Sequence, residues 1–334
     1  MILFIGVLED NYILNVEHGK TYLLRIVNAA VHNDYYFKIA GHKFTVVTAD
    51  ANYVKPYTTD IIAIAPGETV DALVVCDAHP GKYYMVGLAM HTPDRLILPK
   101  VTSRGILHYN DPSPISDGTP AISPEMPLNN EFTTSFYFHG NLTSLPHPLL
   151  RPVPPNVDER WIITTDTGYF CKEGGTACRA IVARMNNISF VMPTAPLLQA
   201  HYYKNMSNVV STLRELPSSQ PNIVYNEGTV MKATSFRRVP YNTTLEIVFQ
   251  GPPHMQTFPN PMHLHGHDVF ILAQGIGTYD VEKHVPTYNL VDPPVRNTVD
   301  CPRFGWTAIR FVTTNPGTCN YMCCIDIFFE KSVF

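Results

Sequence analysis

The sequence is short of charged residues, and the few it has nearly balance. Only 16% of its 334 residues are Asp, Glu, Lys or Arg, and the formal net charge is −4. A nucleic-acid-binding domain carries a basic patch, which this balance does not provide. No apolar run reaches the length of a membrane-spanning helix. We therefore expect neither nucleic acid nor a membrane among the partners of this chain.

Several motifs of catalysis and targeting are also missing. The sequence has no Gly-rich phosphate loop, no nucleophile elbow with Ser, His and Asp, and no motif of paired carboxylates. The apolar stretch at residues 1–8 lacks a basic region and a small-residue cleavage site. We therefore do not interpret this stretch as a signal peptide.

The composition favours a packed all-β protein. Apolar residues make up 45% of the chain, and it has 18 Tyr, 17 Phe and 29 Pro. Aromatic and β-branched residues are enriched in strands, and proline is frequent in the turns between them. Short apolar runs separated by turn residues predict a β-sandwich. These runs lie at 21–27, 36–40, 43–48, 61–65, 72–76, 83–86, 188–192, 245–250, 269–273 and 308–312.

The runs fall into two groups, which predicts two domains. Residues 113–130 are rich in Pro, Ser and Asp and are typical of a linker between a domain at 1–112 and a domain at 131–334. Segments 72–81 and 308–317 also match in spacing, because each has a strand-like run followed by Pro-Gly. This internal repeat predicts that the two domains are related sandwiches.

Two cysteines and four sequons are candidates for modification, on the condition that the chain reaches an oxidising, secretory compartment. Cys171 and Cys178 bracket a Gly-Gly turn and are candidates for a small disulfide loop. The adjacent Cys323 and Cys324 are not expected to bridge each other, because neighbouring side chains on an extended segment point apart. The Asn-x-Ser/Thr sequence of an N-glycosylation site occurs at Asn141, Asn187, Asn205 and Asn242.

Three histidines near the C-terminus form the most distinctive pattern in the sequence. His263, His265 and His267 alternate, so on a strand their side chains project from one face. Imidazoles placed in this way can bind Cu or Zn, with Cys323 or Cys324 as a further ligand. The alternative is that they are ordinary strand residues with hydrogen-bond partners inside the sandwich.

The segment around these histidines, Pro-Asn-Pro-Met-His-Leu-His-Gly at 259–266, resembles the His-Pro-x-His-Leu-His-Gly copper motif of multicopper oxidases. Asn260 stands in place of the first histidine. Further segments resemble the second and third plastocyanin-like domains of plant laccases. They are 19–30, 54–57, 64–67, 187–193, 197–201, 289–293, 296–299 and 305–311. The resemblance implies two cupredoxin-like Greek-key sandwiches, without the first domain of the family.

The resemblance also implies a function. Plant laccases use copper to oxidise phenols, including lignin precursors, and reduce dioxygen in the cell wall. By this resemblance we expect copper as cofactor, phenolic small molecules as partners, and a secreted glycoprotein of the apoplast.

The same resemblance assigns the copper-ligand positions, and most of them are changed. Cys323 matches the thiolate of the type 1 copper, while Asn260 and Phe328 replace its two histidines. His263 and His265 match two of the eight histidines of the three-copper cluster. Met322 and Cys324 replace two more of the eight. Because several convergent ligands are needed to hold such a centre, we expect no laccase turnover by this chain alone.

Two alternatives to an enzyme remain open. One is a non-catalytic cupredoxin module that binds a protein partner through surfaces that the first domain would otherwise cover. The other is a poorly folded product of a decayed gene. A cooperative unfolding transition favours the module, and its absence favours decay.

Overall fold

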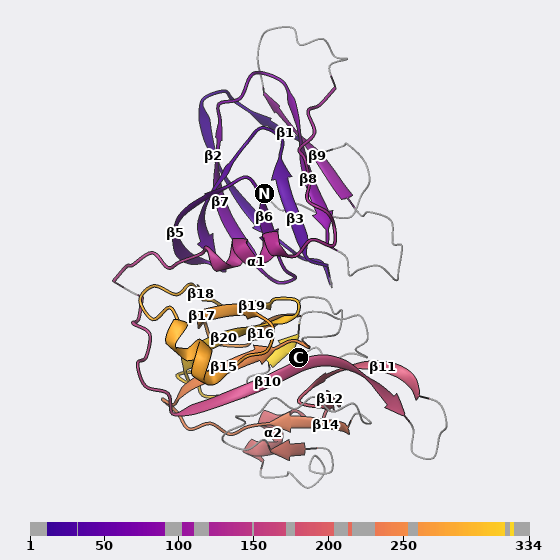
Figure 1. Cartoon of the computed structure of the whole chain (residues 1–334), viewed down its shortest axis with the longest axis vertical. Coiled ribbons are helices and arrows are strands. Elements are labelled where there is room, and N and C mark those ends of the chain that lie inside the picture. Colours follow the sequence, from indigo (N-terminus) through magenta and orange to yellow (C-terminus); the bar gives the residue numbers. More distant parts are fainter. Residues whose placement is uncertain are drawn as a thin grey trace. The chain divides into compact units, whose positions relative to one another are not determined.

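The computed structural model describes most of the chain as β-strands joined by turns (Figure 1). No helix among the described residues is long and apolar enough to cross a membrane. The described residues are 12–31, 33–90, 102–109, 120–148, 150–171, 178–203, 213–215, 231–252, 260–317 and 321–323.

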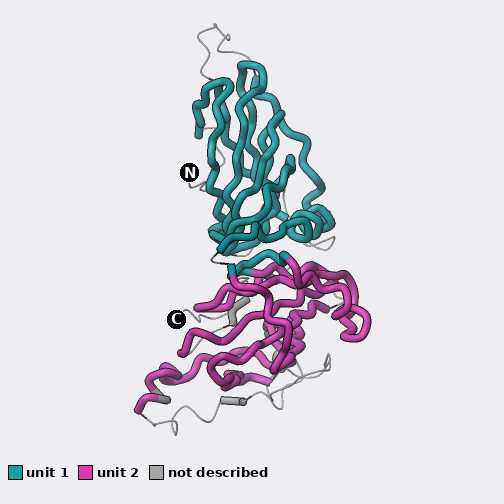
Figure 2. The backbone as a smooth tube through the Cα atoms, turned by 90° about the vertical axis from the view of Figure 1, so that its left-hand side faces the viewer, with its two compact units in different colours: residues 1–150, 292–298 teal, residues 151–291, 299–334 magenta. Residues whose placement is uncertain are grey.

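The chain forms two compact units (Figure 2). Unit 1 comprises residues 1–150 and 292–298, and unit 2 comprises residues 151–291 and 299–334. The domains predicted from the sequence, at 1–112 and 131–334, were assigned by resemblance to the plastocyanin-like domains of the family. These bounds remain a prediction. The described part of the predicted linker, from residue 120, belongs to unit 1, where Ile122 exchanges backbone hydrogen bonds with β8 at Lys82 and Tyr84.

Unit 1 is built from two sheets. One sheet has the strand order β2-β7-β4-β5 and the other has the order β1-β9-β8-β3-β6. The strands are β1 (Ile13–Val16), β2 (Lys20–Val27), β3 (Tyr35–Ile39), β4 (Phe44–Ala49), β5 (Asn52–Thr59), β6 (Ile62–Ile64), β7 (Thr69–Cys76), β8 (Lys82–Ala89) and β9 (Thr102–Tyr109).

Alternating burial explains why these segments form a sandwich. In β7, Val70, Ala72, Val74 and Cys76 are buried, while the residues between them are more exposed. One face of the strand therefore joins the core and the other faces solvent, which is the period of two expected of a half-buried strand. The core between the sheets contains Tyr36, Phe44, Ile62, Met85 and Leu107, each no more than 1% exposed.

The helix α1 (Thr133–Gly140) was not predicted from the sequence. The carboxylate of Glu131 accepts hydrogen bonds from the backbone N–H groups of Thr133 and Thr134 and so caps the start of the helix. The buried Phe138 anchors α1 to the unit 1 core.

The main sheet of unit 2 contains the order β13-β14-β12-β11-β10-β15-β20-β17. A smaller sheet has the order β19-β16-β21. The strands are β10 (Glu159–Cys171), β11 (Cys178–Met185), β12 (Ile188–Phe190), β13 (Leu213–Glu215), β14 (Met231–Phe236), β15 (Thr244–Gln250), β16 (Asn260–Leu264), β17 (Val269–Ile276), β19 (Thr298–Cys301), β20 (Gly305–Val312) and β21 (Tyr321–Cys323). The remaining elements of the chain are α2 (Leu197–Tyr202), α3 (Val281–His284), a 3-10 turn (Val285–Thr287) and β18 (Val295–Arg296).

The predicted strands lie within or overlap observed ones, and the two segments that match in spacing lie in similar surroundings. Strand β7 lies between β2 and β4 with antiparallel pairing on both sides, and β20 lies in the same way between β15 and β17. The prediction of an all-β fold with sandwich sheets is therefore confirmed.

Candidate metal centre

The strand that carries the histidine motif pairs with the strand that carries the vicinal cysteines. Strands β16 and β21 are antiparallel, and their backbone register places His263 opposite Met322 and Met262 opposite Cys323. Segments about 60 residues apart in the sequence are thus adjacent at this point of unit 2, as a common metal site would require. The side chains of Met322 and Cys323, and all of Cys324 and Phe328, lie outside the described residues.

His263 and His265 come together, as the sequence predicts. Their ring centroids are 5.1 Å apart and their planes are inclined by 53°. Both residues are partly buried, and Met262 and Leu264 beside them pack into the unit 2 core. Two imidazoles that bind one ion at a nitrogen–metal distance of about 2 Å stand at a comparable separation. The pair can therefore supply two ligands to one ion.

His267 is placed differently, because the strand ends before it. Residues 265 and 266 form a turn, and Gly266 has the positive φ of 75° that such a turn uses. The His267 ring packs 5.2 Å from the ring of Phe311, and its Nδ1 lies 3.4 Å from the carbonyl of His265. His267 thus faces the core of unit 2 and is not part of the imidazole pair.

The described side chains do not fit a complete copper centre. Among the residues that the structure describes, no group of three or more His, Cys, Asp or Glu is placed to hold a metal ion. A catalytic site of the usual kind needs at least three protein ligands, and a type 1 copper site needs two histidines and a thiolate. We therefore derive no reaction step through copper.

The candidate disulfide falls on a β-hairpin. Cys171 and Cys178 are directly paired in the register of β10 and β11. The Cα atoms of directly opposed residues are about 4.5–5.5 Å apart, which is within the range that a disulfide spans. Their side chains lie outside the described residues, so the disulfide stays a prediction.

The candidate glycosylation sites differ in their surroundings. Asn141 and Asn242 are exposed, at the end of α1 and at a tight turn with φ of 64°. Asn187 is only partly exposed, and its Oδ1 accepts a hydrogen bond of 2.6 Å from Arg184. Asn205 lies outside the described residues. These observations favour Asn141 and Asn242 over Asn187.

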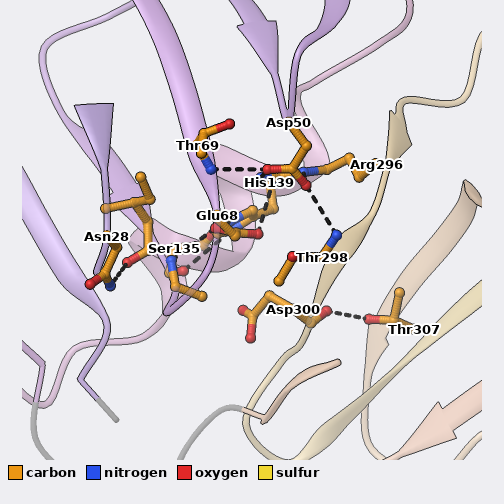
Figure 3. Close-up of polar contacts among 12 residues, drawn as sticks. Asn28, Asp50, Glu68, Thr69, Ser135, His139, Arg296, Thr298, Asp300 and Thr307 are labelled. Carbon is orange, nitrogen blue, oxygen red and sulfur yellow. Dashed lines mark hydrogen bonds and ion pairs between the residues drawn. The ribbon is translucent and has the colours of Figure 1, made fainter. Parts of the chain in front are cut away.

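Sequence reasoning missed a buried charge cluster in unit 1, which Figure 3 shows. The guanidinium of Arg296 binds both oxygens of Asp50 at 3.0 and 3.2 Å, and its Nη1 lies 3.1 Å from Oε1 of Glu68. Nε2 of His139 lies 3.0 Å from the other oxygen of Glu68. These four side chains, the unit 1 tetrad, are between 0 and 6% exposed.

Local turns place the two acids of the tetrad. Asp50 and Ala51 both have positive φ, at 47° and 63°, and form the two-residue turn between β4 and β5. Glu68 ends a turn in which Pro66 and Gly67 occupy the central positions, and its N–H donates to the carbonyl of Ala65 at 3.0 Å. The Pro-Gly signal was visible in the sequence, but the ionic partners of Glu68 were not.

Charges around Glu68 keep it ionised despite complete burial. Burial by itself raises the pKa of this carboxyl, but the positive charges of Arg296 and His139 and the N–H of Ala65 outweigh burial and lower the pKa overall. Hydrogen bonds and opposite charges that favour the charged form act in this direction.

Unit 2 has its own buried network, in which one acid lies between two arginines. Glu246 in β15 is fully buried and lies 2.5 Å from Nε of Arg160 and 2.7 Å from Nη2 of Arg310. Nearby, the hydroxyls of Tyr279 and Tyr288 are 2.5 Å apart. Burial raises the pKa of Tyr288, and the negative charge of Glu246 adds to the increase. Both networks cross-link distant segments of their own unit.

Comparison with known proteins shows similarity to a single family. Two family profiles, both described as multicopper oxidase, match residues 6–112 and 197–333. Among curated proteins, the chain is 44% identical to laccase-15 of Oryza sativa subsp. japonica over 93% of its own length and 57% of the relative. It is 38% identical to laccase-7 of Arabidopsis thaliana over 94% of the chain and 57% of that relative. The chain thus spans just over half the length of these relatives.

Solved structures agree on the fold. The crystal structure of Fet3p, titled as a multicopper oxidase that functions in iron import, aligns with 94% of the chain at a TM-score of 0.70 and 20% identity. The laccase from Botrytis aclada aligns with 94% of the chain at a TM-score of 0.63 and 22% identity. The chain covers 55% and 50% of these two structures, respectively.

Proposed function

Because the chain belongs to the multicopper oxidase family, with plant laccases among its relatives, we propose that it is a laccase-like protein without copper-oxidase turnover of its own. It retains the scaffold of the family and at most a single-ion site at His263 and His265. The oxidation of phenols and lignin precursors, implied by the relatives, is not supported by the residues of this chain.

The observation that carries this proposal is the register of β16 and β21. It places side by side two segments to which the family resemblance assigns copper ligands, and the resemblance supplies the assignment of each position. The type 1 positions hold Asn260, Cys323 and Phe328, which leaves a single strong copper ligand. The cluster positions that the resemblance assigns in the same two stretches of sequence hold His263, His265, Met322 and Cys324.

The donors that remain suit a single ion. Two adjacent imidazoles match the preferences of Zn²⁺ and copper. An ion bound at such a site stabilises the folded chain. It does not provide the second copper centre that electron transfer to dioxygen requires. A single-ion structural site is the form of metal binding that we propose.

The location of the protein is also a proposal. The relatives are plant laccases, and the exposed Asn141 and Asn242 are accessible acceptors for glycosylation in a secretory compartment. The hairpin register of Cys171 and Cys178 suits an oxidising environment. These features support a secreted glycoprotein of the apoplast.

Metal analysis of the purified full chain tests the proposal. After loading with Cu²⁺ or Zn²⁺ and removal of free ion, we expect no more than one ion per chain and no copper-dependent oxidation of a phenol. The matched variant His263→Ala/His265→Ala should lose the ion. Four coppers per chain, or phenol oxidation that requires copper, contradicts the proposal.

A second function, as a protein-binding module, is favoured by exposed apolar side chains on unit 1. Leu23 and Val75 are 46% and 48% exposed on the paired strands β2 and β7, and β2 ends its sheet order. We propose a plastocyanin-like domain of an intact relative as the partner of this face. Light scattering of the chain mixed with such a relative should show a complex that Leu23→Lys abolishes. A complex that is unaffected by this variant, or no complex, excludes the role.

A further inference from the structure

Unit 1 contains a buried pair of a phenol and an imidazole. The hydroxyl of Tyr109, the last residue of β9, lies 2.7 Å from Nε2 of His42. Tyr109 is 1% exposed and His42 is 5% exposed, so the bond lies in a low-dielectric environment that strengthens it. The pair shares no residue with the tetrad or with the histidine motif.

Local structure fixes the orientation of the imidazole. His42 follows a turn in which Gly41 has a φ of 70°, and the N–H of His42 donates to the carbonyl of Ile39 at 3.2 Å. Nδ1 of His42 lies 2.7 Å from the carbonyl oxygen of Ala40. A carbonyl only accepts hydrogen bonds, so Nδ1 carries a proton. In the neutral ring the lone pair is therefore on Nε2, which faces the phenol.

The contacts of the Tyr109 hydroxyl favour the neutral ring. The N–H of Ala78 donates to the phenol oxygen at 3.2 Å, and the thiol of Cys76 lies beside this oxygen. An N–H only donates and a thiol accepts weakly, so the hydroxyl hydrogen is best matched by the Nε2 lone pair. Burial raises the pKa of Tyr109, so the phenol keeps its proton at neutral pH.

A hydrogen bond to a base changes what a phenol does when it loses an electron. An oxidised phenol is a far stronger acid than the phenol itself, and its proton leaves at once if a base is in reach. Here the proton moves along an existing bond to Nε2 of His42. The products are a neutral phenoxyl radical and an imidazolium. The imidazolium donates from Nε2 to the radical oxygen and from Nδ1 to the carbonyl of Ala40, so both of its N–H groups are satisfied.

We propose that Tyr109 is a redox-active tyrosine and that His42 is its proton acceptor. A strong one-electron oxidant in solution, such as an oxidising radical or a high-potential metal complex, takes one electron from the phenol. The proton passes from the hydroxyl of Tyr109 to Nε2 of His42 in the same step. Reduction by one electron returns the proton and restores the phenol, so the pair stores one oxidising equivalent inside unit 1.

The pair lies within reach of an oxidant at the surface. The ring of the exposed His18 is 6.2 Å from the ring of Tyr109, measured between centroids. An electron tunnels across a gap of this size without direct contact, whereas a proton needs a hydrogen-bonded acceptor. The electron can therefore leave unit 1 while the proton stays on His42.

Tyr83 provides a matched comparison within the same cluster. Tyr83 is 6% exposed, and its ring centroid is 5.7 Å from that of Tyr109. Its hydroxyl donates to the carbonyl of His79 at 2.7 Å. A backbone carbonyl accepts a hydrogen bond but is too weak a base to take the proton. Tyr83 thus shares the burial and the location of Tyr109 but lacks the proton acceptor.

Flash photolysis of the full chain with a ruthenium tris-bipyridine complex and a sacrificial electron acceptor tests the proposal. Electron paramagnetic resonance of samples frozen after the flash should show a phenoxyl radical coupled to an exchangeable proton, which is the Nε2 proton of the imidazolium. Tyr109→Phe should lose this signal, and Tyr83→Phe should keep it. No such radical in the wild-type chain, or a signal that survives Tyr109→Phe, overturns the proposal.

The rate of radical formation tests the role of His42. In His42→Gln, which keeps a hydrogen-bonding side chain without a base, the rate should fall about 100-fold or more, as expected on loss of a positioned proton acceptor. The variant of the exposed His79, His79→Gln, is the control and should keep the wild-type rate. Urea denaturation checks that each variant is folded. An unchanged rate in folded His42→Gln contradicts the proposal.

The wild-type chain gives a check that needs no variant. Because the proton moves together with the electron, the radical should form more slowly in D₂O than in H₂O. Equal rates in the two solvents contradict the coupled transfer.

Discussion

The two units repeat one arrangement of strands and differ in what they place on it. The order β2-β7-β4 in unit 1 corresponds to β15-β20-β17 in unit 2. On the other side of the repeat, β6-β3-β8 corresponds to β19-β16-β21. Strand β3 contributes Tyr36 and Phe37 to the core, whereas β16 contributes Met262 and Leu264, carries His263, and is followed directly by His265.

The absence of the histidines from β3 shows that the strand arrangement and the histidine motif are independent features. In unit 1 the corresponding strand β3 has the sequence Tyr-Tyr-Phe-Lys-Ile, without a histidine. The imidazoles of unit 2 are only partly buried, while Met262 and Leu264 beside them are buried. The fold of the repeat therefore does not depend on a metal, and loss of ligands is compatible with a folded chain.

The units also differ in how they bury charge. In unit 1 one arginine lies between two acids, and in unit 2 one glutamate lies between two arginines. The unit 1 arginine lies in the segment 292–298, whereas Arg160 and Arg310 come from strands next to Glu246. Removal of Arg296 leaves Asp50 without this counter-charge while Glu68 keeps His139. Removal of either arginine in unit 2 leaves Glu246 with the other.

The largest effect is expected for Arg296→Met. This change leaves Asp50 and Glu68 buried without their shared partner, which costs about 3–5 kcal/mol of unfolding free energy. Urea denaturation at neutral pH measures the loss. Lys55→Met, which removes an ion pair with a half-exposed lysine, is the control and should cost less than about 1 kcal/mol. Equal losses in both variants would show that the tetrad is not what anchors the segment 292–298 in unit 1.

The hairpin of β10 and β11 in unit 2 allows a second test. If Cys171 and Cys178 are joined, Cys171→Ser/Cys178→Ser should lower the unfolding free energy by about 2–3 kcal/mol, since the disulfide closes a short loop. Mass spectrometry after alkylation without reduction should show the two cysteines unmodified. Alkylation of both in the native chain would disprove the disulfide.

In unit 2, Arg310→Met should have a smaller effect than Arg296→Met. Glu246 keeps its bond of 2.5 Å to Arg160, so we expect a loss of about 2 kcal/mol from the hydrogen bonds to the charged group. The same urea series measures it. A loss as large as that of Arg296→Met would mean that the half-buried Arg160 does not compensate the charge of Glu246.

The smallest effect is expected at the histidine motif. His263→Ala/His265→Ala should change the unfolding free energy of the metal-free chain by less than about 1 kcal/mol, because the core side chains beside them remain. Thermal unfolding in the presence of a chelator measures this. A large loss without metal would show that the imidazoles are structural and would favour the alternative of hydrogen-bonded strand residues.

Strand positions were predictable from the sequence because burial in a sandwich alternates along each strand. The run at 72–76 and the Pro80-Gly81 turn gave β7 and the start of β8 correctly. The adjacency of His263 and His265 followed from the same period of two. The helix α1 was missed because its cap comes from Glu131, a residue outside the usual capping position.

The attachment of residues 292–298 to unit 1 and the tetrad could not be predicted in this way. The sequence separation between Asp50 and Arg296 is 246 residues, and no local pattern marks either as ionic partners. His139 likewise gains its partners only when α1 packs near the turn at Glu68. Long-range ion pairs depend on tertiary structure, whereas turns and strands are encoded by neighbouring residues.

The central claim is that the scaffold of the copper site persists and only its ligands are missing. The most direct test is the variant Asn260→His/Phe328→His, which restores two imidazoles to Cys323. After addition of Cu²⁺, the account predicts the intense visible absorption of a thiolate–copper centre in this variant and none in the unmodified chain. The same absorption in the unmodified chain, or none in a folded restored variant, would contradict the account.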